Sequence, residues 1–290
     1  MSPTAIPGNL ILQSPSNSIW KITSDQVNPP GDAAITYDIT NAGGVFNLRS
    51  TGTVDYEIEW GDGNVEISTV NVLPHTYTAG NYDLVVYSDG VYRPYFNNVT
   101  ADATQITSVT IGPGANLGTD LGGAWYGASN MTSFVCPFDV TSGVINLVRA
   151  WRNCNSLTSF PLINTSSCTV FTNAWRDCSS LTGFNLIDTS SGTDFTNAWR
   201  DCNSLSSFPA NMFDTTGTLV SNAFQGAWTN CALTAQSIEN ILVSLDTNGA
   251  SSITLAINGG TNAAKTTWSA AAVTAYDNLI VKGWTISFNA

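Results

Sequence analysis

The sequence predicts a mainly β protein in which a small antiparallel β-sandwich is followed by a solenoid of repeated coils and a short α+β cap. Three observations predict this order. Apolar and polar residues alternate with a period of two over residues 33–100, as in half-buried strands. A motif of about two dozen residues then recurs about five times over residues 101–231. Apolar residues at helical spacing appear after it, within residues 232–290.

The excess of acidic residues limits the kinds of partner that the chain can bind. Lys and Arg number 9 and Asp and Glu number 21, so the formal net charge is -12. Such an acidic chain repels nucleic acid backbones and anionic lipid, which argues against both as partners. No run of about 18 apolar residues is present to span a membrane, and no secretory signal is visible. We therefore expect no nucleic acid binding and no membrane insertion.

Residues 1–32 are rich in Pro, Ser and Asn and are predicted to form an extended arm with one short strand at NLIL. Arms of this composition often become ordered only against a partner. The arm therefore predicts a homo-oligomer, or a form bound to a larger particle.

Five segments between residues 33 and 100 have β patterning: AITYDI, VFNLRS, VDYEIEW, VEIST and YDLVVYS. Gly, Asn and Asp interrupt them at NAGG, GDGN and TAGN, which are compositions typical of turns. Short strands at this spacing predict a small antiparallel sandwich.

The next part of the chain repeats itself. The segment FTNAWRDC occurs at residues 171–178 and again at 195–202. Its Ala-Trp pair recurs from Ala124 to Ala227 at intervals of 26, 24, 24 and 29 residues. A strand-like segment keeps step with it and reads ITSV, MTSF, LTSF, LTGF and LSSF in turn. One short strand in each period of about 20–29 residues indicates a leucine-rich-repeat solenoid.

Packing explains the residues that repeat. One coil buries too little apolar surface alone, whereas stacked coils share a continuous core. Ala174 and Ala198 allow the next coil to approach closely, and the motif arginines are expected to pair outside with Asp177 and Asp201. The residues expected to stack as a structural ladder are Trp151, Trp175, Trp199, Trp228, Cys154, Cys178, Cys202 and Cys231.

The six cysteines fit this packing better than a disulfide or metal framework. Equivalent positions in stacked coils bring thiols together as small, buried apolar groups. No Cys-x-x-Cys or Cys/His spacing suggests zinc. The four ladder cysteines are therefore predicted to be reduced, and the state of Cys136 and Cys168 stays open.

Residues 232–290 depart from the repeat and are predicted to cap the open end of the solenoid. Apolar residues from Ile238 to Leu245 have helical spacing, and a second helix is predicted over residues 269–281. The segments SITLAING and GWTISFNA are strand-like.

Two groups of motifs resemble known families. AWRNCNSLTSF at 150–160 and AWRDCSSLTGF at 174–184 resemble the BspA-type leucine-rich repeat. IEWGDGNVE at 58–66, with PHTYTAGNYDLVVY at 74–87, is similar to the polycystic-kidney-disease-type (PKD) β-sandwich. The resemblance implies a surface-binding or adhesive protein of bacterial surfaces or of phages, many of them marine. It implies no catalytic residue, no cofactor and no particular ligand.

Two groups of residues in the predicted sandwich are candidates for chemistry. His75 is the only histidine, so any Ser-His-Asp or Cys-His device must use it; the PKD resemblance instead implies that it opens a strand and makes structural hydrogen bonds. Asp55, Glu57 and Glu59 share one strand face and are candidates for a cation site, although they match no calcium loop. The simpler interpretation of these acids is a solvated strand face.

Two further groups of candidate residues lie in the repeats. Paired carboxylates hydrolyse glycosides, and Asp177 and Asp201 stand one coil apart; every coil offers the same position, however, which is typical of a structural ladder. Aromatic residues near the junction of the two modules form a candidate contact patch, with junction packing as the alternative: Tyr92, Tyr95, Trp125 and Tyr126.

These expectations combine into a non-enzymatic, structural or adhesive protein of a phage virion, serving as a tail fibre, receptor-binding protein or capsid decoration. Its partners would be other virion proteins, or a glycan or protein on the host cell surface. A secreted bacterial surface adhesin is the alternative within the binding class. A polysaccharide depolymerase is the alternative of another class.

Overall fold

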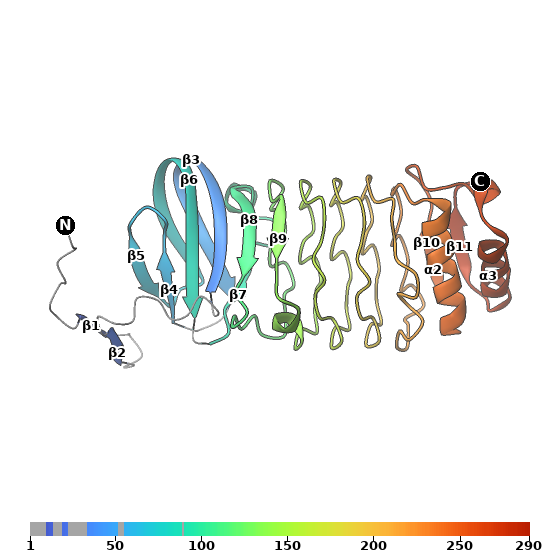
Figure 1. The fold of residues 1–290 in the computed structure, drawn as a ribbon, viewed down its shortest axis with the longest axis horizontal. Helices are drawn as coiled ribbons and strands as arrows, with labels where there is room; N and C mark the ends of the chain where they lie inside the picture. The colour runs from blue at the N-terminus through green and yellow to red at the C-terminus, as the bar shows by residue number, and fades with distance from the viewer. Residues whose placement is uncertain (1–9, 14–18, 23–33, 52–54, 89) are drawn as a thin grey trace, which may run out of the picture.

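The computed structural model describes residues 10–13, 19–22, 34–51, 55–88 and 90–290. These residues form an elongated molecule with a β-sheet at one end, stacked coils in the middle and two helices at the other end (Figure 1). The described chain is mainly β, as predicted.

Part of the predicted arm is among the described residues. The strand predicted at NLIL is β1 (Leu10–Gln13), and it pairs antiparallel with β2 (Ile19–Ile22), which the sequence did not predict. The remainder of the arm, and with it the prediction that it is extended, lies outside the described residues.

A mixed, mostly antiparallel sheet forms the first part of the molecule, in the order β5-β4-β6-β3-β8-β9 with β7 beside β3. Its strands are β3 (Ala34–Thr51), β4 (Tyr56–Glu59), β5 (Val65–Ser68), β6 (Val72–Ser88), β7 (Arg93–Pro94), β8 (Ile106–Ile111) and β9 (Ser133–Val135). The paired β3 and β6, with 18 and 17 residues, form its centre.

Two of the predicted turns are wrong. NAGG lies inside β3 and TAGN lies inside β6, so AITYDI and VFNLRS form one continuous strand. Gly43 and Gly44 have φ of 94° and 132°, and this backbone freedom lets the strand bend there instead of ending. The two segments lie opposite each other, with Ala42 facing Ala79 and Gly44 facing Tyr77. Their backbone groups are therefore used by the ladder between the two strands.

The predicted GDGN turn is confirmed and joins β4 to β5. It closes with a hydrogen bond of 3.0 Å from the Trp60 amide to the Asn64 carbonyl. Gly61 has φ of 76°, and a Cβ there would lie 2.7 Å from the backbone carbonyl oxygen of Asp83 in β6. Only glycine fits this close approach, which holds the turn against the sheet.

The sheet continues directly into the coils through β8. This strand is antiparallel to β3, with Ile111 opposite Ile35, and parallel to β9 in the next coil. The short helix α1 (Thr100–Ala103) precedes it. The segment ITSV, predicted as the strand of the first coil, therefore belongs to the upstream sheet as well, and the sheet covers the first open face of the stack.

Backbone hydrogen bonds hold each coil to the next. The Trp151 amide donates to the Ala174 carbonyl and the Trp175 amide to the Ala198 carbonyl, both at 2.9 Å. Of the strand-like segments, ITSV and MTSF contribute to β8 and β9, whereas the later ones meet only through isolated bridges such as Gly183 to Ser207. One or two bonds at each contact are enough to fix the register without forming a regular strand. Beside β9 lies one short 3-10 helix, η2 (Phe138–Thr141).

Aromatic rings fill the interior of the coils. The tryptophans of successive coils stack with centroids 5.2–5.8 Å apart, and all are fully buried: Trp125, Trp151, Trp175, Trp199 and Trp228. A parallel column of phenylalanines has a spacing of 5.9 Å: Phe134, Phe160, Phe184 and Phe208. The two columns meet edge to face, as between Trp175 and Phe184 at 4.7 Å. The predicted tryptophan ladder therefore points inward.

The last part of the chain closes the stack. It contains α2 (Ala235–Asn248), β10 (Thr254–Ile257), η3 (Lys265–Thr267), α3 (Ala270–Val281) and β11 (Thr285–Phe288), with β10 and β11 parallel. Thr234 and Ser269 cap the two α-helices by accepting backbone N–H groups. β10 takes the place of another coil, because the Trp228 amide donates to the Ala256 carbonyl at 3.1 Å. Both predicted helices and both strand-like segments are confirmed.

Candidate functional site

Each coil turns through two corners with left-handed backbone. These are the residue before the Ala-Trp pair and the third residue after its alanine. Their φ values lie between 54° and 93°: Gly123, Arg149, Asn173, Asn197 and Gly226 at the first corner, and Gly127, Asn153, Asp177, Asp201 and Asn230 at the second. Glycine, asparagine and aspartate tolerate this conformation best, which explains the N and D of NAWRD. Arg149 is the one exception among these ten corners.

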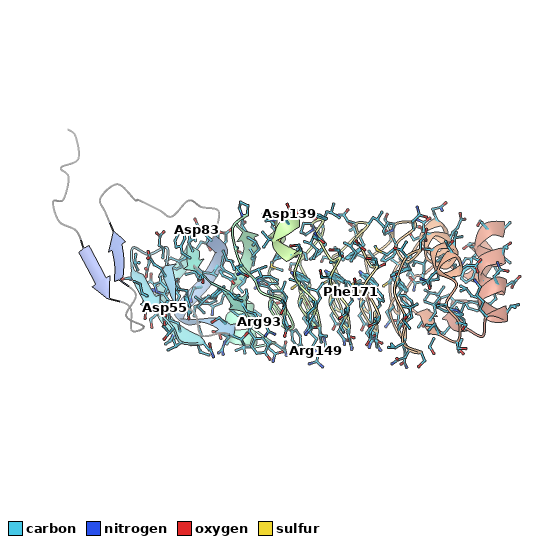
Figure 2. The ribbon with its side chains drawn as sticks, turned by 90° about the horizontal axis from the view of Figure 1, so that it is seen from below. Asp55, Asp83, Arg93, Asp139, Arg149 and Phe171 are labelled. Carbon is cyan, nitrogen blue, oxygen red and sulfur yellow. The ribbon has the colours of Figure 1, made fainter. Side chains whose placement is uncertain are left out.

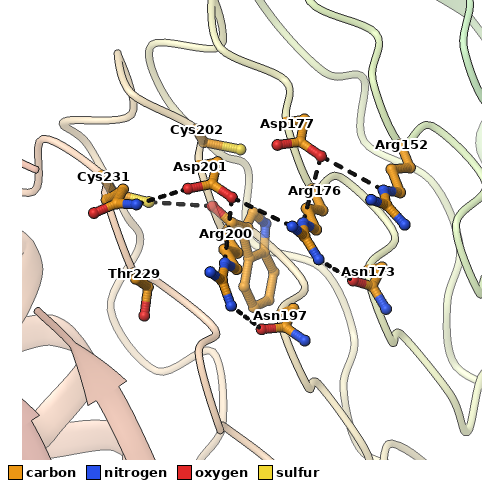
Figure 3. Close-up of polar contacts among 12 residues, drawn as sticks. Arg152, Asn173, Arg176, Asp177, Asn197, Arg200, Asp201, Cys202, Thr229 and Cys231 are labelled. Carbon is orange, nitrogen blue, oxygen red and sulfur yellow. Dashed lines mark hydrogen bonds and ion pairs between the residues drawn. The ribbon is translucent and has the colours of Figure 1, made fainter. Parts of the chain in front are cut away.

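An arginine ladder, consisting of Arg152, Arg176 and Arg200, runs along these corners (Figure 3). Arg176 lies between two carboxylates, 3.4 Å from Asp177 and 3.7 Å from Asp201. The same acids contact the neighbouring arginines at 3.5 and 3.2 Å. The predicted pairing of the motif arginines with Asp177 and Asp201 is therefore confirmed. Because the side chains are partly exposed, each pair contributes about 0–1 kcal/mol.

A groove with a volume of about 440 Å³ lies elsewhere on the coils. Its rim carries three large apolar side chains that are about half exposed, Phe138 at 47%, Leu162 at 49% and Leu186 at 51%. Leu162 and Leu186 occupy the same position in consecutive coils, each followed by a buried isoleucine. Met212, also buried, belongs to the lining in the next coil.

Polar groups lie beside the apolar rim of this groove. The backbone amide of Ser190 donates to one Asp188 carboxylate oxygen at 2.8 Å, and the Asp188 side chain is exposed. Thr189 is buried and donates its hydroxyl to the backbone carbonyl of Met212, which joins two coils. Asn211 and Thr215 complete the polar part of the lining. The groove therefore combines exposed aliphatic surface with an available carboxylate.

Sequence reasoning missed this groove. The sequence feature that could have indicated it is a repeat at the coil interval: LINT at 162–165 and LIDT at 186–189. The isoleucine and threonine of each are buried, while the leucine is exposed. Both apolar residues look alike in the sequence, and only the direction of the chain at this turn separates them.

The predicted aromatic contact patch is wrong for two of its four members. Tyr92 is 3% exposed and Trp125 is fully buried, because Trp125 is the first member of the stacked tryptophan column. Tyr95 and Tyr126 are half-buried, and each has an arginine over its ring, Arg93 and Arg152 respectively. Junction packing is therefore the correct interpretation of Tyr92 and Trp125.

The acids near the GDGN turn do not assemble into a cation site. Glu57 and Glu59 lie on the outer face of β4, and burial together with the charge of Glu59 raises the pKa of Glu57. No group of three or more His, Cys, Asp or Glu side chains in the described part of the chain is arranged to hold a metal ion. Asp55 precedes the strand and joins no such group.

The structural hydrogen bond that the PKD resemblance implies for His75 is present, but His75 does not open a strand, because it lies within β6 opposite Phe46. Its Nε2 atom lies 2.8 Å from the Asp62 carboxylate, and its ring stacks on Trp60 with centroids 4.4 Å apart. Asp62 also accepts the backbone amide of Asn64 across the turn, at 3.0 Å. Burial raises the pKa of Asp62, but the hydrogen bonds from His75 and Asn64 outweigh it, so the pKa lies below the ordinary 3.8.

The six cysteines are free and buried. In the ladder, each thiol lies against the tryptophan carbonyl of the preceding coil, as Cys178 does with Trp151 at 3.2 Å. Burial raises the pKa of Cys136 and of Cys168 to about 12 and that of Cys154 well above its ordinary 9.0. Because the thiolate is the reactive form, these groups are poor nucleophiles in the folded protein. The state that the sequence left open for Cys136 and Cys168 is the reduced one.

Comparisons with known protein families, with curated proteins and with solved structures find no match to this chain. Within the described residues, no helix is both long enough and apolar enough to cross a membrane.

Proposed function

We propose that the chain is a non-enzymatic structural or adhesive protein of a phage particle. In this proposal residues 33–100 form a PKD-type sandwich, residues 101–231 a BspA-type leucine-rich-repeat solenoid, and residues 232–290 its cap. The coils display their outer surface to a host glycan or protein, or to a neighbouring virion subunit. The arm at residues 1–32 attaches the molecule to the particle.

One observation carries the proposal: the coils have a filled interior and a patterned exterior. The interior holds stacked indole and phenyl rings and thiols whose pKa values are raised by burial. The exterior repeats arginine-aspartate pairs at one set of corners and offers a groove elsewhere. Repeated weak contacts of this kind gain strength when many copies act together.

The arrangement of Asp177 and Asp201 favours attachment over polysaccharide hydrolysis. Glycosidases need two carboxyl groups in different environments, one to donate a proton and one to act as base or nucleophile. Here both carboxylates contact Arg176 and each contacts a second arginine, and Asp201 also accepts a hydrogen bond from Asn230 at 2.8 Å. Both acids therefore lie among cations and hydrogen-bond donors, and neither has the apolar surroundings that keep a carboxyl group protonated as a general acid. A ladder of such ion pairs does not separate the two roles.

Immunogold electron microscopy of particles that contain this chain tests the proposal. We expect label at regular positions on the capsid or tail. Label confined to a bacterial envelope would overturn the virion location in favour of the secreted adhesin.

Incubation with host capsule or lipopolysaccharide tests the non-enzymatic part. We expect binding without release of oligosaccharide. Release that is lost in Asp177→Asn or Asp201→Asn would replace the proposal with a depolymerase.

A further inference from the structure

We propose that the groove lined by Phe138, Leu162, Leu186, Asp188 and Met212 binds an extended peptide segment of a partner protein in which basic and apolar side chains alternate. The inference deepens the proposed function and depends on it in one respect, namely that the coil surface is what the molecule offers to partners. It names the chemistry of the partner at one part of that surface.

The first support is the exposed apolar rim. Exposed apolar residues scattered singly are ordinary on a protein surface, whereas three that line one depression offer a shared apolar surface to a partner. Leu162 and Leu186 stand one coil apart, and Phe138 extends the same rim into the preceding coil. About half of each of these three side chains is exposed to solvent, and the groove that they border has a volume of about 440 Å³.

The second support is the separation of charge across the molecule. Of the residues that line the groove, Asp188 is charged and none is basic. Asp139, which follows Phe138, is exposed as well. Asp139 and Arg149 lie at opposite edges of the coils (Figure 2), and the arginine ladder contributes no residue to the groove. A basic group that enters the groove therefore meets the carboxylate of Asp188, with no cation in the lining to compete for it.

The third support is the match between this lining and lysine or arginine. These side chains place an aliphatic stem along apolar surface and keep the charged end in water. Leu186 and Asp188 provide aliphatic surface and a carboxylate two residues apart, and one oxygen of the Asp188 carboxylate accepts the backbone amide of Ser190. A sugar would instead need flat aromatic surface, and Phe138 is the single aromatic residue of the lining.

Fluorescence anisotropy with labelled probe peptides tests the inference on the purified full chain. The probe is a short peptide of alternating leucine and lysine; the comparison peptides alternate leucine with glutamate and serine with lysine. We expect the leucine-lysine peptide to bind at least about tenfold more tightly than either comparison peptide, which corresponds to about 1.4 kcal/mol. Equal binding of the serine-lysine peptide would show attraction by net charge alone and would overturn the inference.

Substitutions in and outside the groove test whether the leucine-lysine peptide binds there. Leu186→Asn and Asp188→Asn should each weaken binding of the leucine-lysine peptide by about tenfold, whereas Ile145→Asn and Asp277→Asn, which change exposed residues outside the groove, should leave it unchanged. An equal loss in the control variants would contradict the inference. Unchanged thermal unfolding of each variant shows that the fold is retained.

A labelled oligosaccharide distinguishes the other class of ligand. If it binds and Leu186→Asn abolishes its binding while the peptide does not bind, the groove is a glycan site and the inference is wrong. Because the assay does not depend on where the molecule resides, its failure is distinct from absence of the chain from phage particles.

Discussion

The indole rings of Trp151 and Trp175 lie within 1° of parallel, with centroids 5.8 Å apart. One backbone bond from each tryptophan amide to the following coil holds this spacing. The stacked rings make the interior continuous from one coil to the next, so the stability of each coil depends on its neighbours.

Removing one indole should therefore destabilise the whole stack. We expect Trp175→Ala to lower the free energy of unfolding by about 3–5 kcal/mol, because the ring is fully buried. Leu162→Ala, on the exposed rim of the groove, should change it by less than about 0.5 kcal/mol. Denaturation in urea followed by circular dichroism measures both. Similar values for the two variants would mean that the tryptophan is not buried in solution.

The left-handed backbone conformation of Asp177, more than the charge of its side chain, should determine how much this residue contributes to the stability of the fold. Asp177 has φ of 64°, and Asn153 and Asn230 occupy the equivalent corner in other coils. We expect Asp177→Asn to change the unfolding free energy by less than about 1 kcal/mol, the worth of exposed ion pairs. Asp177→Ala should cost about 1 kcal/mol more, since alanine disfavours left-handed backbone. Equal effects in urea denaturation would show that the charge dominates.

Arg149 lies at the first corner of its coil, and its replacement should stabilise the fold, whereas replacing Asp177 should not. It is the residue with a long side chain among corners otherwise occupied by glycine, asparagine or aspartate, with φ of 60°. We expect Arg149→Gly to stabilise the protein by about 1 kcal/mol by relieving this conformation, although glycine usually destabilises. Arg149→Ala removes the same side chain and keeps the strain, so it serves as the matched control. A melting temperature raised by alanine but not by glycine would refute the explanation.

The bond between Asp62 and His75 should make the sheet sensitive to acid. The pKa of Asp62 in the folded protein lies below 3.8. A carboxylate with a lowered pKa adds stability that is complete above its unfolded value and is lost as the pH falls through its folded value. We therefore expect the stability difference between wild type and Asp62→Asn to shrink below pH 3.8. Urea denaturation across this range measures it, and a difference independent of pH would contradict the assignment.

The thiols should be unreactive until the protein unfolds. All six cysteines are buried and free, and burial raises the pKa of Cys136 and Cys168 to about 12. We expect a colorimetric disulfide reagent at neutral pH to titrate none of them in the native protein and all six in denaturant. Rapid reaction of the native protein would place thiols at the surface and remove the ladder from the core.

Periodicity was sufficient to predict the coils because each repeats the same contacts. The inward tryptophans, the outward pairs of Asp177 with arginine and the helix over residues 269–281 follow from the sequence pattern alone. Strand ends were harder to predict. Gly43 and Gly44 look like a turn, yet a partner segment of equal length lies opposite and keeps the strand continuous.

The side chains that face solvent at the candidate site were also hard to predict from the sequence. Trp125 and Tyr92 resembled surface aromatics because the sequence does not show that β8 and the first coil pack against the sheet there. Leu186 and Ile187 are equally apolar, and which of them faces solvent depends on the path of the irregular segment that follows Phe184. Side-chain type therefore predicted the core, while the direction of irregular turns, which decides the surface, could not be predicted.

Iodide quenching of tryptophan fluorescence in a Trp20→Phe variant tests the central claim most directly, because the side chain of Trp20 lies outside the described residues. The other eight tryptophans are buried. A blue-shifted emission with almost no quenching in the native state, and full quenching in denaturant, is the predicted result. Strong native quenching that added sugar suppresses would place the indoles in an open cleft and contradict the account.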